Sequence, residues 1–380
     1  MNRRSSPRFR FFGASVLLVT LAFGIPAMKE GDPRLYLLTA AVPSVMLLSC
    51  TVLARALSMD RPLLTLSLYL CAAGIIALIP TDPDAAIAQS VRCCAALFFL
   101  SAGAVLVRHL YAPVPVFAAS GFLGLLLVSA RTLIPGISFP LTETALILLL
   151  ISFAVAQPRL GTLPALLPAS AGTVMLLFLQ DQPLEALIWG VLLLGLVFAA
   201  DGRMMIVLPA AAVLVLLAWK VWGGLSFALP DSQPGFSLPD LLSVAGLWGT
   251  DQLPEAMTAS GSSFSLFPML AWHDGMVFAG FTVLLFLPLS LRGTFIASCA
   301  RSRFHAILAM GCALMIALRC LAALLAAFGL LPSTGPAFPL LTSSVSNLCA
   351  ECFGLGLLCG ISGQNEQDLR EDTHLAMLGK

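Results

Sequence analysis

The sequence predicts an all-α protein, a polytopic transmembrane helical bundle of about 12 spans, within a range of 10 to 12. Of its 380 residues, 59% are hydrophobic and only 10% are charged, whereas soluble domains carry about 25% charged residues. Apolar runs of roughly 20 residues, long enough to cross a bilayer as a helix, recur along the whole chain. The net charge of +1 shows no basic bias of the kind that indicates a nucleic-acid partner.

The apolar runs define the individual spans. We place them at residues 11–28, 35–54, 62–80, 87–107, 113–130, 140–156, 162–180, 184–200, 204–222, 268–291, 304–331 and 338–361. The first run is as long as a signal peptide, but no small-residue cleavage site follows it. We therefore interpret it as a span that is held on the cytoplasmic side by Arg3, Arg4, Arg8 and Arg10.

The positions of lysine and arginine predict that the N-terminus and the C-terminus both lie in the cytoplasm. With the N-terminus inside, fourteen of these residues fall in cytoplasmic segments and four in outer segments, namely Lys29, Arg34, Arg131 and Lys220. Cytoplasmic loops of membrane proteins carry such an excess of positive charge.

The same pattern divides the chain into five segments. They are N-terminal transmembrane helices at 1–135, core helices at 136–222, a long extracytoplasmic loop at 223–267, the last three spans at 268–361 and a cytoplasmic tail at 362–380. The loop is rich in Pro, Gly, Ser and Asp, and its apolar patch at 241–248 is too short to span, so we interpret it as a re-entrant or interfacial helix. We expect the polar tail to be disordered or a short surface helix.

Polar groups inside spans are costly and are functional hypotheses by default. Glu143 lies near the outer end of the sixth span, Arg319 inside the eleventh and Glu351 inside the twelfth. His273 and Asp274 lie near the outer start of the tenth span. A structural interpretation stands beside the functional one, because Arg319 can pair with Glu351 or with a nearby carbonyl to hold the bundle together.

Other polar groups also lie toward the predicted outer face. Asp181, Gln182 and Glu185 form a turn between two spans, where they are either solvated or functional. Ser343, Ser344, Ser346 and Asn347 can hydrogen-bond neighbouring helices.

The sequence predicts neither a metal site nor a soluble-enzyme motif. The four histidines are scattered, and we interpret the C-x-x-C of Cys349 and Cys352 as helix packing rather than a redox or metal motif. We find no Walker loop, no dinucleotide fingerprint and no H-E-x-x-H, which disfavours an ATP-driven transporter. We expect no cofactor, with a divalent cation left open.

From Gly136 onward, four stretches carry a family resemblance. Residues 136–145, G-I-S-F-P-L-T-E-T-A, and residues 329–339, G-L-L-P-S-T-G-P-A-F-P, are the most informative. They resemble G-x-x-x-Q-P-S-E-x-A-K and G-L-L-P-x-T-G-x-P-x-P of the SEDS family, the FtsW, RodA and SpoVE proteins of bacterial cell-wall synthesis. Residues 179–186 and the R-G…R-S-R-F pattern that begins at Arg292 resemble two further family segments.

The chain departs from the family pattern at several positions. Glu143 falls on the family glutamate, but Leu146 replaces the lysine that follows, so the Glu–Lys pairing of the family is lost. The family run S-Y-G-G-S-S becomes T-S-S-V-S-N at 342–347, and Arg319 falls where the family tends to have glutamine.

The resemblance implies that the chain polymerises lipid II into glycan strands on the outer face of the bacterial cytoplasmic membrane. It also implies work beside a class B penicillin-binding protein in division, elongation or sporulation. Joining a sugar hydroxyl to an anomeric carbon that bears a lipid pyrophosphate needs a carboxylate to accept the hydroxyl proton. It also needs cations or dipoles for the pyrophosphate and a groove for the polyprenyl chain.

The essential aspartate of the family, in H-T-D-F-I-F-A, has two possible registers here. One puts His273 on the histidine and Asp274 one residue early. The other, which we favour from helix length, puts residues 263–267 there and leaves no aspartate, with Asp274 two turns into a helix that begins near Leu266. The candidate catalytic residues are therefore Asp274, Glu255 and Asp251, and the candidate substrate-binding residues are Glu143, His273, Arg319, Thr334, Gly335 and Ser346.

Three functions remain open. They are an active glycosyltransferase, a catalytically degenerate SEDS protein that acts as a scaffold or binds lipid-linked sugars, and a flippase for a lipid-linked precursor. We also expect Glu143, Asp274 and Arg319 to approach one central cavity that faces outward.

Overall fold

A computed structural model describes most of the chain. The described residues are 19–24, 28, 31, 33–109, 114–133, 142–178, 182–202, 204–227, 246–250, 266–328, 330–331 and 338–378. Every secondary-structure element in these ranges is a helix, as the composition predicts.

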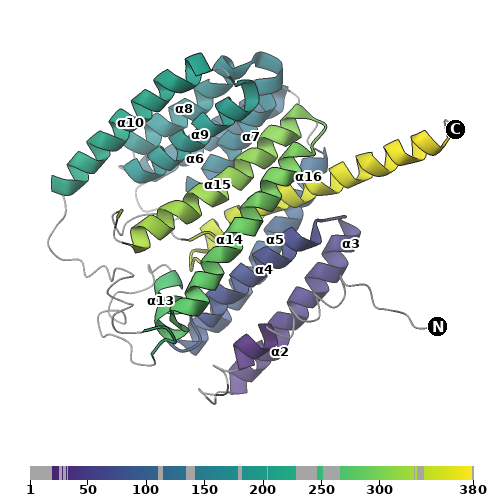
Figure 1. The fold of residues 1–380 in the computed structure, drawn as a ribbon, viewed down its shortest axis with the longest axis vertical. Helices are drawn as coiled ribbons and strands as arrows, with labels where there is room; N and C mark the ends of the chain where they lie inside the picture. The colour runs from purple at the N-terminus through teal and green to yellow at the C-terminus, as the bar shows by residue number, and fades with distance from the viewer. Residues whose placement is uncertain are drawn as a thin grey trace.

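The N-terminal helices run back and forth along the bundle (Figure 1). α2 (Pro33–Leu48) continues through a π-helical turn (Ser49–Leu53) into α3 (Ala54–Ala56). α4 (Arg61–Ile76) and α5 (Pro83–His109) follow, and then α6 (Val114–Leu133). α4 has a proline in its first turn, where the missing N–H has no intrahelical partner to lose.

The core helices follow in close succession. α7 (Thr142–Leu160), α8 (Thr162–Phe178), α9 (Pro183–Asp201) and α10 (Met204–Phe227) are joined by short connections. Gly202 ends α9 with a φ of 62°, a left-handed conformation that costs glycine little and other residues more.

The last part of the chain differs from the predicted spans. The tenth span is not one helix, because α13 (Leu266–His273) and α14 (Gly275–Ser298) are separated at Asp274. Gly275, which follows the break, has a φ of 84°. α15 (Arg303–Ala327) agrees closely with the eleventh predicted span.

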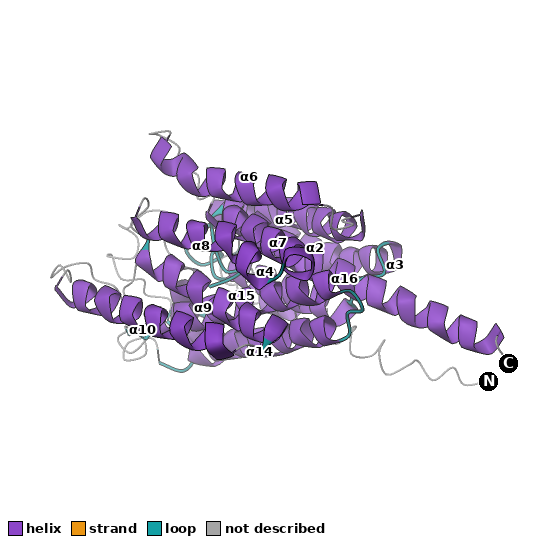
Figure 2. Cartoon of the chain, turned by 90° about the horizontal axis from the view of Figure 1, so that it is seen from above, coloured by secondary structure: helices purple, strands orange, loops and turns teal. Residues whose placement is uncertain are grey.

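The predicted twelfth span, 338–361, begins too early, and its helix extends beyond the predicted end. Residues 338–344 are not helical, and Leu340 has a φ of 63°. α16 (Val345–Leu378) begins later and continues through most of the predicted tail. Apolar side chains alone could not reveal this boundary, because residues 338–341 are as buried and apolar as a span. Figure 2 shows α16 projecting past the other helices toward the C-terminus.

Several helices are long and apolar enough to cross a membrane. Among the described residues there are seven, in the ranges Pro33–Ala56, Pro83–His109, Thr142–Leu160, Pro183–Asp201, Gly275–Ser298, Arg303–Ala327 and Val345–Leu369. Four shorter apolar helices accompany them. The chain is a multi-pass membrane protein, while its exact number of spans and its orientation stay predictions.

Small residues allow α5 and α16 to pack closely. A Cβ atom at Gly103 would lie 2.5 Å from the carbonyl oxygen of Phe353, and one at Gly356 would clash with the backbone of Leu100. Such small-residue contacts are typical of helix pairs in membranes. This packing fixes α16, which carries part of the site described next.

Candidate functional site

A buried arginine lies at the centre of a charged cluster. Arg319, inside α15, forms ion pairs with Glu143 of α7 and, at 3.1 Å, with Glu185 of α9. The side chains of Arg319 and Glu143 are only 3% and 7% exposed. Because the three residues come from three helices, the ion pairs fix the relative positions of α7, α9 and α15.

Glu351 adds a third carboxylate and holds the segment before α16. Its Oε2 accepts a hydrogen bond of 2.6 Å from the backbone N–H of Leu340, and it also interacts electrostatically with Arg319. On the other side of this segment, Gln89 of α5 donates to the carbonyl of Thr342 at 2.9 Å. Glu351 and Gln89 together stabilise a non-helical turn whose backbone groups have no helical partners.

The cluster carries an excess of carboxylates. One guanidinium faces Glu143, Glu185 and Glu351, and Oε2 of Glu143 is buried without a hydrogen-bond partner among the described residues. Buried charges are costly unless they are paired. This cluster is therefore our candidate functional site among the described residues.

The cluster also restores a pairing that the sequence pattern lacks. Leu146 replaces the lysine that follows the glutamate in the resembling motif and is 2% exposed, three residues after Glu143 in α7. The cation comes instead from α15, because Arg319 pairs with the same glutamate. The ion pair is present here, but with its positive member on another helix.

Asp274 lies at the junction of α13 and α14. It is partly exposed, and the adjacent His273 ends α13. The helix breaks here, so the expectation that Asp274 lies inside a continuous helix from Leu266 is wrong. A carboxylate at a helix junction is better placed to meet a ligand than one on the side of an uninterrupted span.

A turn from the long loop is pinned against this junction. The backbone N–H of Thr250 donates to the carbonyl of Trp272 at 2.9 Å, and that of Val277 donates to the carbonyl of Leu247 at 3.5 Å. A Cβ atom at Gly275 would lie 2.6 Å from the backbone of Trp248. The turn therefore fixes the backbone around Asp274.

Aromatic packing connects the junction to the charged cluster. The rings of Phe267 in α13 and Phe338 stack with centroids 4.1 Å apart. Phe338 begins the segment that Glu351 holds through Leu340. The two features are thus linked through packed side chains.

The structure places only some of the predicted site residues. Glu143 and Arg319 are in direct contact, His273 and Asp274 are neighbours at the junction, and Ser346 lies in the first turn of α16, with its hydroxyl 3.3 Å from that of Ser344. Asp251, Glu255, Thr334, Gly335 and Asp181 lie outside the described residues.

Two residues near the charged cluster are not among the site residues that the sequence predicts. Glu185 was interpreted as part of an outer turn, but it lies in the first turn of α9, facing Arg319. Gln89 is fully buried. The signal for both is a polar side chain within one or two turns of the start of a span.

Metal ligation finds no support in the described part of the chain. Within it, no three His, Cys, Asp or Glu side chains are arranged so that they could hold a metal ion. The carboxylates of the cluster surround a guanidinium instead.

Comparisons with known proteins agree with one another. Residues 250–367 match the model of the FtsW/RodA/SpoVE family, described as cell cycle proteins. This region contains the α13–α14 junction, Arg319 and Glu351. A comparison with curated protein sequences finds no match.

Solved structures show the same fold. One is a chain from a structure described as the structural coordination of polymerization and crosslinking by a peptidoglycan synthase complex. It has a TM-score of 0.62 and 23% sequence identity, and the match covers 81% of this chain and 99% of that chain. A variant of the rod shape determining protein RodA of Thermus thermophilus has a TM-score of 0.60 at 23% identity, covering 80% and 97%. The unmodified RodA has a TM-score of 0.58 at 22% identity, covering 80% and 96%.

Proposed function

We propose that the chain is a member of the SEDS family of FtsW, RodA and SpoVE proteins, whose model matches residues 250–367. We propose further that it polymerises lipid II into glycan strands on the outer face of the bacterial cytoplasmic membrane. In this proposal both termini lie in the cytoplasm, as the charge distribution predicts. The observation that carries it is the buried charged cluster around Arg319. Glu351 and the ring contact between Phe338 and Phe267 link this cluster to α13, which ends next to Asp274.

Asp274 is our first candidate for the base. The carboxylate accepts the proton of the attacking sugar hydroxyl as its oxygen forms a bond to the anomeric carbon of the second sugar. The bond from that carbon to the pyrophosphate breaks, and the polyprenyl pyrophosphate leaves. Asp251 and Glu255, which precede α13 in the chain, are the alternative bases.

The cluster around Arg319 has a positioning role in this proposal. Glu143 and Arg319 are almost fully buried, so they act by holding α7, α9 and α15 around the substrate. His273, Ser346, Thr334 and Gly335 remain our candidates for substrate contacts. We propose that no cofactor is needed. Whether a divalent cation takes part is left open, and the assay below tests it.

We propose a class B penicillin-binding protein as the partner. The support is the similarity to a chain described as part of a peptidoglycan synthase complex. A glycan strand made at the outer surface must next be cross-linked, and a partner that holds the cross-linking activity close by receives the strand directly.

A catalytically degenerate scaffold is the second candidate. The replacement of the motif lysine by Leu146 and the loss of the S-Y-G-G run favour it. A flippase is less well supported, because in the described helices the charged cluster lies at one end of the spans and apolar core residues such as Leu150 and Ile151 fill α7 beyond it.

The test is glycan polymerisation from labelled lipid II by the purified protein, with and without the class B partner. Polymer from the wild type but not from Asp274→Ala supports Asp274 as the base. Polymer from both proteins moves the base to Asp251 or Glu255. A folded wild type that binds its partner and forms no polymer supports the scaffold. A parallel reaction with a chelator measures dependence on divalent cations.

A further inference from the structure

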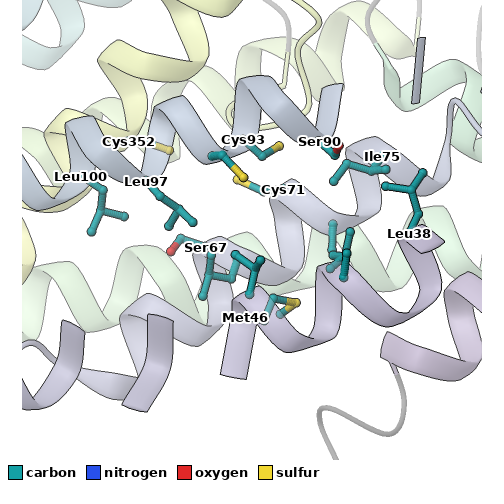
Figure 3. Close-up of a pocket in the computed structure, with 16 residues that line it drawn as sticks. Leu38, Met46, Ser67, Cys71, Ile75, Ser90, Cys93, Leu97, Leu100 and Cys352 are labelled. Atoms are coloured by element: carbon teal, nitrogen blue, oxygen red, sulfur yellow. The ribbon is translucent and has the colours of Figure 1, made fainter. Parts of the chain in front are cut away.

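An apolar groove lies between α2, α4 and α5, and Cys352 of α16 also lines it. It encloses about 100 Å³ and is lined mainly by aliphatic side chains. Figure 3 shows Leu38, Ile75 and Ser90 toward one end and Leu97 and Leu100 toward the other. α2 forms one wall of the groove.

Among the described residues that line the groove, no side-chain hydroxyl group is free. The two hydroxyl groups that line it are satisfied within their own helices, because Ser67 donates to the carbonyl of Leu64 at 2.9 Å and Ser90 to that of Ile87 at 2.6 Å. The remaining polar atoms are thiols such as those of Cys71 and Cys93, which behave as small hydrophobic groups. The chemistry therefore fits a hydrocarbon chain.

The length of the groove matches one leaflet of a bilayer. On α5 its lining extends from Ser90 to Leu100, which corresponds to roughly 15 Å at about 1.5 Å per residue. The hydrocarbon core of a bilayer is about 30 Å thick. The groove thus fits an acyl chain of a single leaflet, and a long polyprenyl chain would exceed it.

A charged pair lies at the end of the groove that we expect to face outward. Arg34, one turn before Leu38 in α2, forms an ion pair of 3.2 Å with Asp84 in the first turn of α5. The two side chains are 68% and 80% exposed, and such surface pairs contribute only about 0–1 kcal/mol. A phosphate at the membrane surface can therefore compete with Asp84 for Arg34.

We propose that this groove binds an anionic phospholipid of the outer leaflet, with one acyl chain between α2, α4 and α5 and its phosphate at Arg34. The lining of the groove includes none of the residues that we propose for glycosyl transfer, and this proposal does not depend on that function. It joins α2 to the rest of the bundle through a lipid.

The test measures phospholipid bound to the purified protein by native mass spectrometry. The probes are phosphatidylglycerol and phosphatidylethanolamine with identical acyl chains. Ala41→Phe fills the groove from α2, and Cys94→Phe fills it from α5; both residues are exposed and line the groove. Ala40→Phe, an exposed neighbour that does not line it, is the matched control.

We expect the wild type and Ala40→Phe to retain one phosphatidylglycerol that both groove-filling variants lose. Arg34→Gln should lower the preference for phosphatidylglycerol over phosphatidylethanolamine about fivefold, as expected for one cation of about 1 kcal/mol at a membrane surface. Arg55→Gln, at the other end of the same helical segment, should leave it unchanged. Equal retention by Ala41→Phe, Cys94→Phe and Ala40→Phe would overturn the proposal, as would an unchanged preference in Arg34→Gln.

A second readout uses the cysteines. Cys94 and Cys299 are both exposed, but only Cys94 lines the groove. Phosphatidylglycerol should slow the reaction of Cys94 with a membrane-permeant maleimide and leave Cys299 unaffected. If the lipid slows the reactions of both cysteines equally, or slows neither reaction, the groove does not hold a lipid.

Discussion

Replacement of Arg319 by glutamine tests the structural role of the charged cluster. The variant removes the only guanidinium that ion-pairs with Glu143 and Glu185 in the described structure, and leaves the carboxylate of Glu143 buried with a side chain 7% exposed. Breaking a buried pair by removing one partner costs about 3–5 kcal/mol. We expect Arg319→Gln to lose about 3 kcal/mol of stability, since the carboxylates can take up protons and so limit the loss.

A second substitution tests whether the loss of stability comes from the missing positive charge or from the missing side-chain volume. Leu146→Lys puts a cation three residues from Glu143 on the same face of α7, because side chains at i and i+3 are neighbours on a helix. In the Arg319→Gln background it moves the positive charge from α15 to α7. We expect the double variant to recover at least half of the lost stability.

The assay is reversible unfolding in mixed micelles, followed by helical circular dichroism. Leu146→Met in the Arg319→Gln background is the matched control, because it keeps the volume and adds no charge. The reasoning is refuted if Arg319→Gln is as stable as the wild type. It is equally refuted if lysine and methionine at position 146 restore the same stability.

Three further substitutions test the packing around the site. Gly275→Ala should destabilise the protein by about 1–3 kcal/mol, since the residue has a positive φ and no room for a Cβ atom. Gly280→Ala is the control, because a Cβ atom there would have no other atom within 4 Å. This variant should be neutral or stabilising in the same unfolding assay. Gln89→Leu should cost about 1–3 kcal/mol by leaving the carbonyl of Thr342 unsatisfied, and faster proteolysis of the segment before α16 should report it. Gly356→Ala should separate α5 from α16, and a wild-type yield of folded protein would contradict this.

The sequence was most informative where a property is local. The apolar runs predicted helices such as α5, α9 and α15 closely, because the bilayer demands about 20 apolar residues for each span. The motif around Glu143 placed this glutamate at the start of α7, and the family resemblance is confirmed by the match over residues 250–367.

Long-range contacts could not be predicted in the same way. The sequence indicated that Arg319 needed a partner, but not that the partners are Glu143 and Glu185 rather than chiefly Glu351. The late start of α16 also depends on tertiary contacts, because Glu351 bonds the N–H of Leu340 only after the chain has turned back. Hydrophobicity does not distinguish such a buried turn from a span.

The most direct test of the central claim is the formation of glycan strands from labelled lipid II by the wild-type protein together with its class B partner. The partner carries an inactivated cross-linking site, so that any polymer comes from this chain. The account predicts polymer from the wild type and a loss of at least tenfold in Arg319→Gln, part of which Leu146→Lys restores. The absence of polymer from a folded wild type that binds its partner would contradict the account.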